Sequence, residues 1–204
     1  MRRIPLSRRS HVTGYGCFGS GAIEHESALE RDFVILTSFA DPNAVLVSQP
    51  MTIRFEDEGR QRRYTPDFSV RWTDGRFELI EVKYRADLRA NWSSLCPGFS
   101  VARDLARERG GRFRIATERS IRCPRLENAK RLLPLRRAAL DPGLAEPALR
   151  ATRSLTAPTF GKIVDAMGSD RAVALSAVWR LIAHGGLKVD LDAPIGSDTP
   201  VMLT

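Results

Sequence analysis

The sequence contains little cysteine and histidine and no long apolar run. Its three cysteines are widely spaced and form no CxxC pair, and its three histidines lie at no ligand spacing beside them. A disulfide framework and a zinc site are therefore both disfavoured. No apolar run reaches the roughly twenty residues of a membrane span, and no apolar segment follows the arginine-rich start as in a signal peptide. We expect a cytoplasmic protein without a membrane partner.

Lysine is also scarce, whereas arginine is abundant. Only 4 of the 32 basic residues are lysines, and the 24 acidic residues leave a net charge of +8 and a pI near 10.1. Such an excess of positive charge indicates a polyanionic partner, most often nucleic acid. The 204 residues, 43% hydrophobic and 27% charged, suffice for one ordinary globular domain and a small second one.

The positive charge is unevenly distributed along the chain. Residues 1–23 form a basic arm, and the glycines of this arm favour an extended segment over a helix. Twelve basic and four acidic residues lie within 103–137, whereas residues 150–204 hold six and five. The candidate DNA-binding residues are arginines: Arg2, Arg3, Arg8, Arg9, Arg103, Arg107, Arg119, Arg122, Arg171 and Arg180. The alternative for any one cluster is that its arginines lie on a solvated helix face, and that the excess of arginine reflects a GC-rich genome.

Hydrophobic periodicity predicts six elements in the first part of the chain. They are a helix over 24–39, strands over 44–55, 62–72 and 76–84, a helix that ends at Gly110, and a strand over 112–117. Gly59 and Gly75 supply the two hairpin turns. The order of one helix, three strands, one helix and one strand predicts an α/β fold with a mixed central sheet.

Three charged residues lie within these strands, where an unpaired charge is costly. Glu81 and Lys83 are two residues apart on one strand and share a face. Asp67 lies on the adjacent strand after Pro66, which can break the ladder locally and direct the Asp67 side chain outward. Two neighbouring carboxylates are stable together around a hard divalent cation such as Mg²⁺ or Mn²⁺. Lys83 could orient or help deprotonate a water and offset the charge on a phosphoryl group. This is the chemistry of phosphodiester hydrolysis.

The motif Pro66-Asp67, thirteen intervening residues and Glu81-Val82-Lys83 resembles the signature of the PD-(D/E)xK nuclease superfamily, and the αβββαβ order resembles its core. A surface hairpin with a cross-strand ion pair is the alternative. The longer pattern ESALERDF, QP, YTPDFSV and IEVK over residues 10–137 resembles the TnsA family, the endonuclease subunit of heteromeric bacterial transposases.

The resemblance implies a restriction-endonuclease-like core and a complete site. Two Mg²⁺ ions, for which Mn²⁺ can substitute, would be bound by Glu30, Asp67, Glu81 and the carbonyl group of Val82, and Lys83 would be the catalytic lysine. It also implies nicking at the 5′ ends of a transposon in double-stranded DNA, an integrase-like transposase that cuts the 3′ ends, an ATPase regulator, and association with the bacterial nucleoid. A stand-alone restriction or repair nuclease and an inactive DNA-binding adaptor are the alternatives.

Glu30 has a second interpretation, because Ser27 and Glu30 have the spacing of a helix capping box. The residues alone do not decide between a cap and a metal ligand. Glu24 or Glu26 could replace Glu30 as the helix acid if the helix began before Ser27.

The end of the chain is expected to form a separate domain. The nuclease unit over 24–137 is followed by a proline-containing linker or short broken helices over 138–158, and by a second unit over 159–204. In that unit two short helices flank Gly168, Ser169 or Asp170 caps the second helix, and the strands LKVDL and TPVML follow. The inner face of the second helix is predicted to contain Val173, Val178, Leu181 and Ile182. This order predicts a winged helix, which binds either DNA or another protein.

Overall fold

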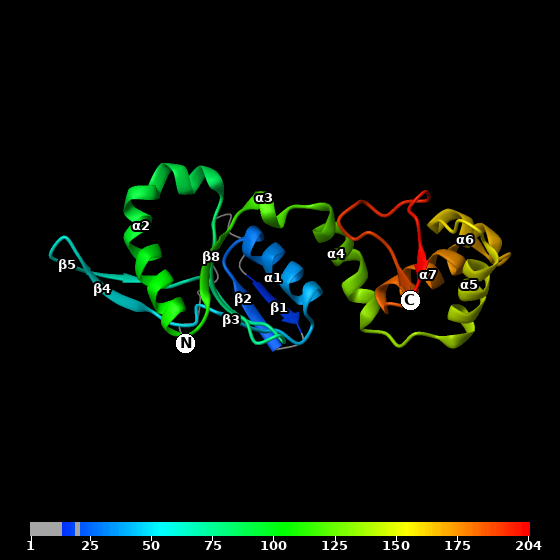
Figure 1. The fold of residues 1–204 in the computed structure, drawn as a ribbon, viewed down its shortest axis with the longest axis horizontal. Coiled ribbons are helices and arrows are strands. Elements are labelled where there is room, and N and C mark those ends of the chain that lie inside the picture. The colour runs from blue at the N-terminus through cyan, green and yellow to red at the C-terminus, as the bar shows by residue number, and fades with distance from the viewer. Residues whose placement is uncertain (1–13, 19–20) are drawn as a thin grey trace. The chain divides into compact units, whose positions relative to one another are not determined.

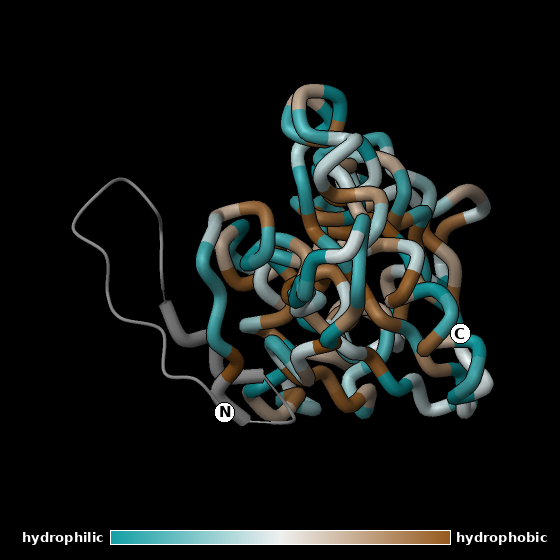
Figure 2. Tube along the Cα trace, turned by 90° about the vertical axis from the view of Figure 1, so that its left-hand side faces the viewer, coloured by the Kyte–Doolittle hydropathy of each residue, from teal (hydrophilic) through white to brown (hydrophobic). Residues whose placement is uncertain are grey.

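The computed structural model describes residues 14–18 and 21–204 in two compact units, Met1–Arg122 and Cys123–Thr204 (Figure 1). Arg2, Arg3, Arg8 and Arg9 of the predicted basic arm lie outside the described residues. Figure 2 shows hydrophobic stretches interleaved with hydrophilic ones along the chain. Within the described part, no helix is long and apolar enough to cross a membrane.

The first unit contains eight strands and three helices among its described residues. In chain order they are β1 (Gly14–Phe18), β2 (Gly21–His25), α1 (Ala28–Ala40), β3 (Val45–Ser48), β4 (Ile53–Asp57), β5 (Arg60–Tyr64), β6 (Phe68–Arg71), β7 (Phe77–Val82), α2 (Arg85–Glu108), β8 (Arg112–Ala116) and α3 (Glu118–Ile121). The central sheet has the order β3-β6-β7-β8, in which β7 and β8 are parallel and the other pairs are antiparallel. The predicted mixed α/β fold is confirmed.

The two faces of this sheet are covered by different helices. Leu29 and Phe33 of α1 pack in one buried cluster with Phe68, Ile80 and other residues of β6 and β7. On the other face α2 lies against β7 and β8, where the rings of Phe99 and Phe113 are 5.5 Å apart. Because strand residues alternate between faces, β7 has Glu78, Ile80 and Val82 toward α1, and Leu79 and Glu81 toward α2.

The first two predicted strands of the core are each broken in two. Val45–Ser48 pairs with Phe68–Arg71 in the central sheet, whereas Ile53–Asp57 and Arg60–Tyr64 pair only with each other in a separate hairpin. The breaks occur around Gln49, which has a positive φ of 44°, and around Pro66, which cannot donate to a ladder. The turns at Gly59 and Gly75 are as predicted, with φ values of 72° and 87°.

The predicted start of the first helix is corrected, and the second predicted helix is confirmed. The helix expected over 24–39 begins only at Ala28, because β1 and β2 form a hairpin through His25 and the side chain of Ser27 caps α1. The segment from Arg85, which the sequence predicts to be helical in at least its second half, is helical from its first residue and is kinked at Asn91 (φ −120°, ψ 15°).

The second unit begins with helices at residues that we had assigned elsewhere. Its elements are α4 (Pro124–Arg136), α5 (Pro142–Ser154), α6 (Phe160–Ala166), α7 (Arg171–Ala183), β9 (Leu187–Lys188) and β10 (Met202–Leu203). Of the two alternatives for 138–158, a linker or short broken helices, the linker is wrong, because α5 is a continuous helix of 13 residues that packs on α7. Pro142 stands in the first turn of α5, where its missing N–H costs no hydrogen bond.

The last part of this unit follows the predicted element order. Gly168 lies between α6 and α7 with a φ of 64°, and Asp170 rather than Ser169 caps α7. Val178, Leu181 and Ile182 are buried as predicted, but Val173 is 40% exposed because it lies in the first turn of α7, away from the core. The antiparallel pair β9 and β10 has only two residues in each strand. The winged-helix assignment stays a prediction.

Candidate active site

Asp67 is placed by the break between β5 and β6. Its side chain turns to β7, where the Oδ2 atom accepts a hydrogen bond of 2.7 Å from the backbone N–H of Val82. The backbone carbonyl group of Asp67 accepts from the N–H of Gln49 at 2.8 Å. Asp67 is therefore fixed between two strands at the end of the sheet, beside the residue that follows Glu81.

Glu81 and Lys83 form a close ion pair at the end of β7. The Nζ atom of Lys83 lies 2.8 Å from Oε1 of Glu81, whose side chain is only 4% exposed. The other oxygen, Oε2, accepts a hydrogen bond of 2.6 Å from the hydroxyl group of Tyr64 at the end of β5. The predicted shared face of Glu81 and Lys83 thus brings both groups into direct contact, and the hairpin contributes a third group.

Glu30 serves as a helix cap in this structure. Its backbone N–H donates to Ser27 Oγ at 3.1 Å, and Ser27 Oγ donates to Glu30 Oε1 at 2.9 Å. The second oxygen accepts from the backbone N–H of Glu26 at 2.7 Å, not from the N–H of Ser27. Since α1 starts after Ser27, the condition under which Glu24 or Glu26 would replace Glu30 is not met.

The electrostatics of the four predicted catalytic residues are coupled. Burial raises the pKa of Asp67 well above its usual range, and the carboxylates of Glu81 and Glu30 raise it further. Burial also raises the pKa of Glu30. For Lys83 burial acts to lower the pKa, but the charge of Glu81 outweighs it and the pKa is raised. Lys83 is therefore a cation at neutral pH, which favours orientation of a water or a phosphate over proton removal.

The donor set fits a hard divalent cation by its chemistry. Asp67 and Glu81 are buried carboxylates close enough to repel one another, and a cation between them relieves that repulsion. In the described part of the chain, no three His, Cys, Asp or Glu side chains are already arranged to hold a metal. Both oxygens of Glu81 and both of Glu30 have hydrogen-bond or ion-pair partners within the fold.

A family model described as TnsA-like endonuclease N terminal matches residues 46–118. This segment is therefore similar to the N-terminal endonuclease domain of TnsA-like proteins. The match contains Asp67, Glu81 and Lys83, and it confirms the resemblance noted in the sequence over this shorter range. No curated protein matches the chain.

The arginines predicted to bind DNA are in different situations around the TnsA-like segment. Arg103 and Arg119 are exposed on α2 and α3. Arg107 pairs with Asp104 at 3.6 Å and is 70% exposed. Arg122 is engaged in the fold, because its guanidinium lies 3.6 Å from the buried carboxylate of Asp32 and donates to the hydroxyl group of Tyr84.

The two arginines of the second unit also have partners. Arg171 pairs with Asp165 at 3.1 Å, and both side chains are about 70% exposed. Arg180 is half-buried and donates to Ser176 Oγ at 3.4 Å. Neither contact prevents an exposed part of the guanidinium from meeting a phosphate.

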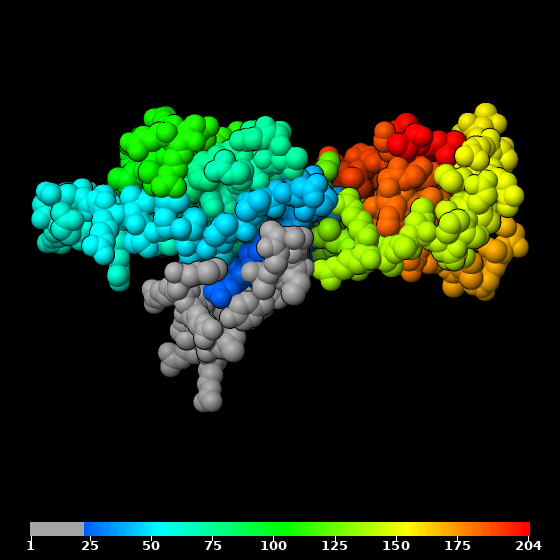
Figure 3. Space-filling model, turned by 90° about the horizontal axis from the view of Figure 1, so that it is seen from below, coloured from blue at the N-terminus to red at the C-terminus, as the bar shows by residue number. Residues whose placement is uncertain are grey.

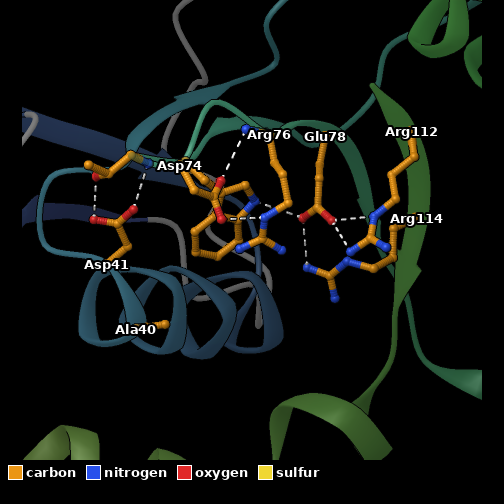
Figure 4. Close-up of a pocket in the computed structure, with 9 residues that line it drawn as sticks. Ala40, Asp41, Asp74, Arg76, Glu78, Arg112 and Arg114 are labelled. Carbon is orange, nitrogen blue, oxygen red and sulfur yellow. Dashed lines mark hydrogen bonds and ion pairs between the residues drawn. The ribbon is translucent and has the colours of Figure 1, made fainter. Parts of the chain in front are cut away.

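A second polar cluster lies on the α1 face of the TnsA-like segment, and sequence reasoning missed it (Figure 4). Glu78 is 1% exposed, and its carboxylate accepts from Arg112 Nε at 2.6 Å, from Trp72 Nε1 at 3.1 Å and from Arg114 at 3.4 Å. These residues line a pocket together with Asp41, Thr73 and others, but the pocket contains none of the predicted catalytic residues.

The electrostatics of Glu78 differ from those of Asp67. Burial acts to raise the pKa of Glu78, but the hydrogen bond from Arg112 and the charge of Arg114 outweigh it and lower the pKa. The alternation of β7 could have indicated that Glu78 is buried, but nothing in the sequence linked it to arginines more than thirty residues away. We interpret this cluster as a structural ion pair.

Proposed function

We propose that the chain is a Mg²⁺-dependent DNA endonuclease subunit of a TnsA-like transposition system, which hydrolyses phosphodiester bonds at the 5′ ends of the transposon. One observation carries the proposal. Within the TnsA-like segment, Asp67, Glu81 and Lys83 converge at one end of the sheet, and Glu30 interacts electrostatically with Asp67 and Lys83. A buried pair of carboxylates beside a lysine is an expensive arrangement that a purely structural sheet does not need.

The residues have distinct roles in this proposal. Asp67, Glu81, Glu30 and the Val82 carbonyl group would hold two Mg²⁺ ions, and Mn²⁺ would substitute for them. When bound, the ions supply Lewis-acid stabilisation of the phosphoryl and leaving oxygens and a more acidic water. The ammonium group of Lys83, held by Glu81, positions the attacking water and offsets negative charge on the phosphoryl group. Tyr64 fixes the orientation of Glu81 through its hydroxyl group.

The partners belong to the same proposal. A TnsA-like subunit would act on double-stranded transposon ends together with an integrase-like transposase and an ATPase regulator. The order of α6, α7, β9 and β10 supports a winged helix over 159–204, with contacts to DNA or to one of these proteins. Neighbouring genes for a transposase and an ATPase would favour this role, whereas a neighbouring methyltransferase gene would favour a restriction nuclease.

Strand-specific cleavage tests the proposal directly. Transposon-end DNA is incubated with the full chain, its partner proteins and Mg²⁺, and the cut strand is mapped. Asp67→Ala and Lys83→Ala should each abolish the 5′ nick while the affinity for DNA stays nearly unchanged. Arg76→Gln, which alters an exposed pair with Asp74 away from the site, is the matched control and should nick normally. Equal nicking by wild type and Asp67→Ala would refute the site.

A further inference from the structure

The hairpin formed by β4 and β5 stands apart from the central sheet. Its two strands pair only with each other, in the register Arg54↔Arg63 and Ile53↔Tyr64. In Figure 1 and Figure 3 the hairpin, drawn in cyan, extends away from the rest of the first unit. A two-stranded ribbon of this kind has two faces, and only one of them is used by the fold.

The used face lies against α2. The ring of Tyr64 contacts Gly98, where an added Cβ would come within 3.0 Å of the ring, and it lies 5.8 Å from the ring of Phe99. On the same face the guanidinium of Arg62 pairs with Asp57 at 3.0 Å. Packing and ion pairing therefore engage Tyr64 and Arg62 of this face.

The other face carries two arginines directly opposite each other. Arg54 and Arg63 are cross-strand partners and both are exposed. Like charges at directly opposed positions destabilise a ladder. Among the residues that the structure describes, neither guanidinium has a carboxylate within ion-pair distance, unlike Arg62. The fold alone thus gives no reason for this pair.

The pair lies close to the candidate active site along the chain. Arg63 precedes Tyr64, whose hydroxyl group holds Glu81, and Asp67 is the fourth residue after Arg63. Four residues of extended chain span at most roughly 14 Å. Along one DNA strand, with a rise of about 3.4 Å per nucleotide, this distance covers about four phosphates.

We propose that the hairpin is a DNA-binding ribbon whose Arg54 and Arg63 contact phosphates of the duplex next to the bond that the site cuts. The inference rests on the nuclease function proposed above for the class of its ligand. A two-stranded ribbon fits the major groove of B-form DNA, and a guanidinium matches the geometry of a phosphate with two hydrogen bonds. A bound phosphate backbone also removes the repulsion between the two arginines, which explains why the repulsion is tolerated.

Salt-dependent binding tests this inference without cleavage. The affinity of the full chain for a fluorescent duplex is measured by anisotropy in EDTA at several salt concentrations. In the Arg54→Gln/Arg63→Gln variant the affinity should fall at least about tenfold, and the slope of log K against log [salt] should decrease by about 2, one unit for each lost phosphate contact. Arg62→Gln removes one positive charge from the α2 face of the same hairpin and should leave the slope unchanged.

A second measurement separates lost contacts from lost structure. Because the double variant loses a like-charge repulsion, its urea midpoint should be equal to or above that of the wild type. A wild-type slope in the double variant would overturn the proposal. Arg54 and Arg63 would then be assigned to binding an acidic segment of a protein, and the proposed nuclease function would be unaffected. Conversely, the slope could be reduced in the double variant while the wild-type chain never nicks DNA. This result would support DNA binding by the hairpin and would refute the proposed nuclease function.

Discussion

At the scale of single residues, the buried carboxylate of Asp67 should reduce the stability of the metal-free protein. Because its pKa is raised, the ionised form is disfavoured in the fold. Its stabilising contribution is complete below the ordinary pKa near 3.8 and is lost as the pH rises through the raised value. In EDTA at neutral pH, Asp67→Asn should therefore increase the free energy of unfolding by about 1 kcal/mol, as measured with urea. The gain should shrink as the pH falls.

Addition of Mg²⁺ should reverse this order of stability. An ion that binds only the folded wild type stabilises it by about 2.7 kcal/mol at a hundredfold excess over its Kd. Asp67→Asn lacks the anionic ligand and should gain little from the same addition. An Asp67→Asn protein that is less stable than wild type in EDTA, or that responds equally to Mg²⁺, would argue against a cation between the carboxylates.

Glu78 should show the opposite dependence on pH. Its pKa is lowered in the fold, so its contribution to stability is present above the ordinary value near 4.5 and is lost as the pH falls through the lowered one. Glu78→Gln should cost about 1–3 kcal/mol at neutral pH, because it weakens bonds to Arg112 and Arg114 inside the fold. The difference from wild type, measured by urea unfolding, should diminish below about pH 4.5. A constant difference across this range would show that lost packing, and not charge, causes the effect.

At the scale of elements, the sequence left undecided whether Ser169 or Asp170 caps α7, and substitutions at these two residues can test the cap that the structure shows. Asp170 Oδ1 accepts hydrogen bonds from the backbone N–H groups of Ala172 and Val173, whereas Ser169 is the residue before the cap. Asp170→Ala should lower the unfolding free energy by about 1 kcal/mol. Ser169→Ala is the matched control and should change it by less than about 0.5 kcal/mol. The reverse ranking in a thermal or urea melt would place the cap one residue earlier.

Some of the helices and strands could be predicted from local sequence patterns, and others could not. Alternation identified β7, and the spacing of Glu81 and Lys83 placed both on one face because strand geometry has a period of two. The break at Gln49 was not predicted, since a kinked strand keeps its alternation of side chains on either side of the kink. The local break at Pro66 was expected, because proline cannot donate to the ladder. α5 was missed because its prolines were interpreted as breakers, although Pro142 occupies the one turn that tolerates proline.

Partners far apart in the sequence were beyond local reasoning. The contact of Asp67 with Val82 followed from a short hairpin and was within reach of prediction. The bonds of Glu78 to Arg112 and Arg114 depend on a parallel crossover through α2, whose register no local pattern specifies. For Glu30, the spacing predicted the bond from its N–H to Ser27 Oγ, but its carboxylate accepts from the N–H of Glu26 and not from that of Ser27. Its role as a metal ligand stays a prediction.

At the scale of the whole molecule, the boundary between the units changes the distribution of charge. Residues 1–122 contain 21 basic and 16 acidic residues, a net charge of +5, and residues 123–204 contain 11 and 8, a net charge of +3. A boundary after residue 137 would have assigned the basic residues of α4 to the nuclease unit. The net charge of the second unit is therefore more positive than that of residues 159–204 alone, and α4 contributes much of this positive charge.

The boundary can be tested by two pairs of fragments. In the second unit α4 buries Leu126, Ala129 and Leu132, and it packs on α7, whose Ala183 carbonyl group accepts from Arg136. Fragments 1–122 and 123–204 should each unfold cooperatively in urea. Fragment 1–137 would carry α4 without its partner and should bind a hydrophobic dye more strongly.

Fragment 138–204 gives the sharpest outcome. Loss of α4 uncovers its contacts on α7, and each leucine burial that is lost costs about 1.5–3 kcal/mol. Two such losses, at Leu126 and Leu132, amount to about 3–6 kcal/mol, which is comparable to the whole stability of a domain of this size. We therefore expect 138–204 to be largely unfolded by circular dichroism, whereas 123–204 is folded. Equal helix content per residue in the two fragments would mean that α4 is dispensable and that the boundary lies after residue 137.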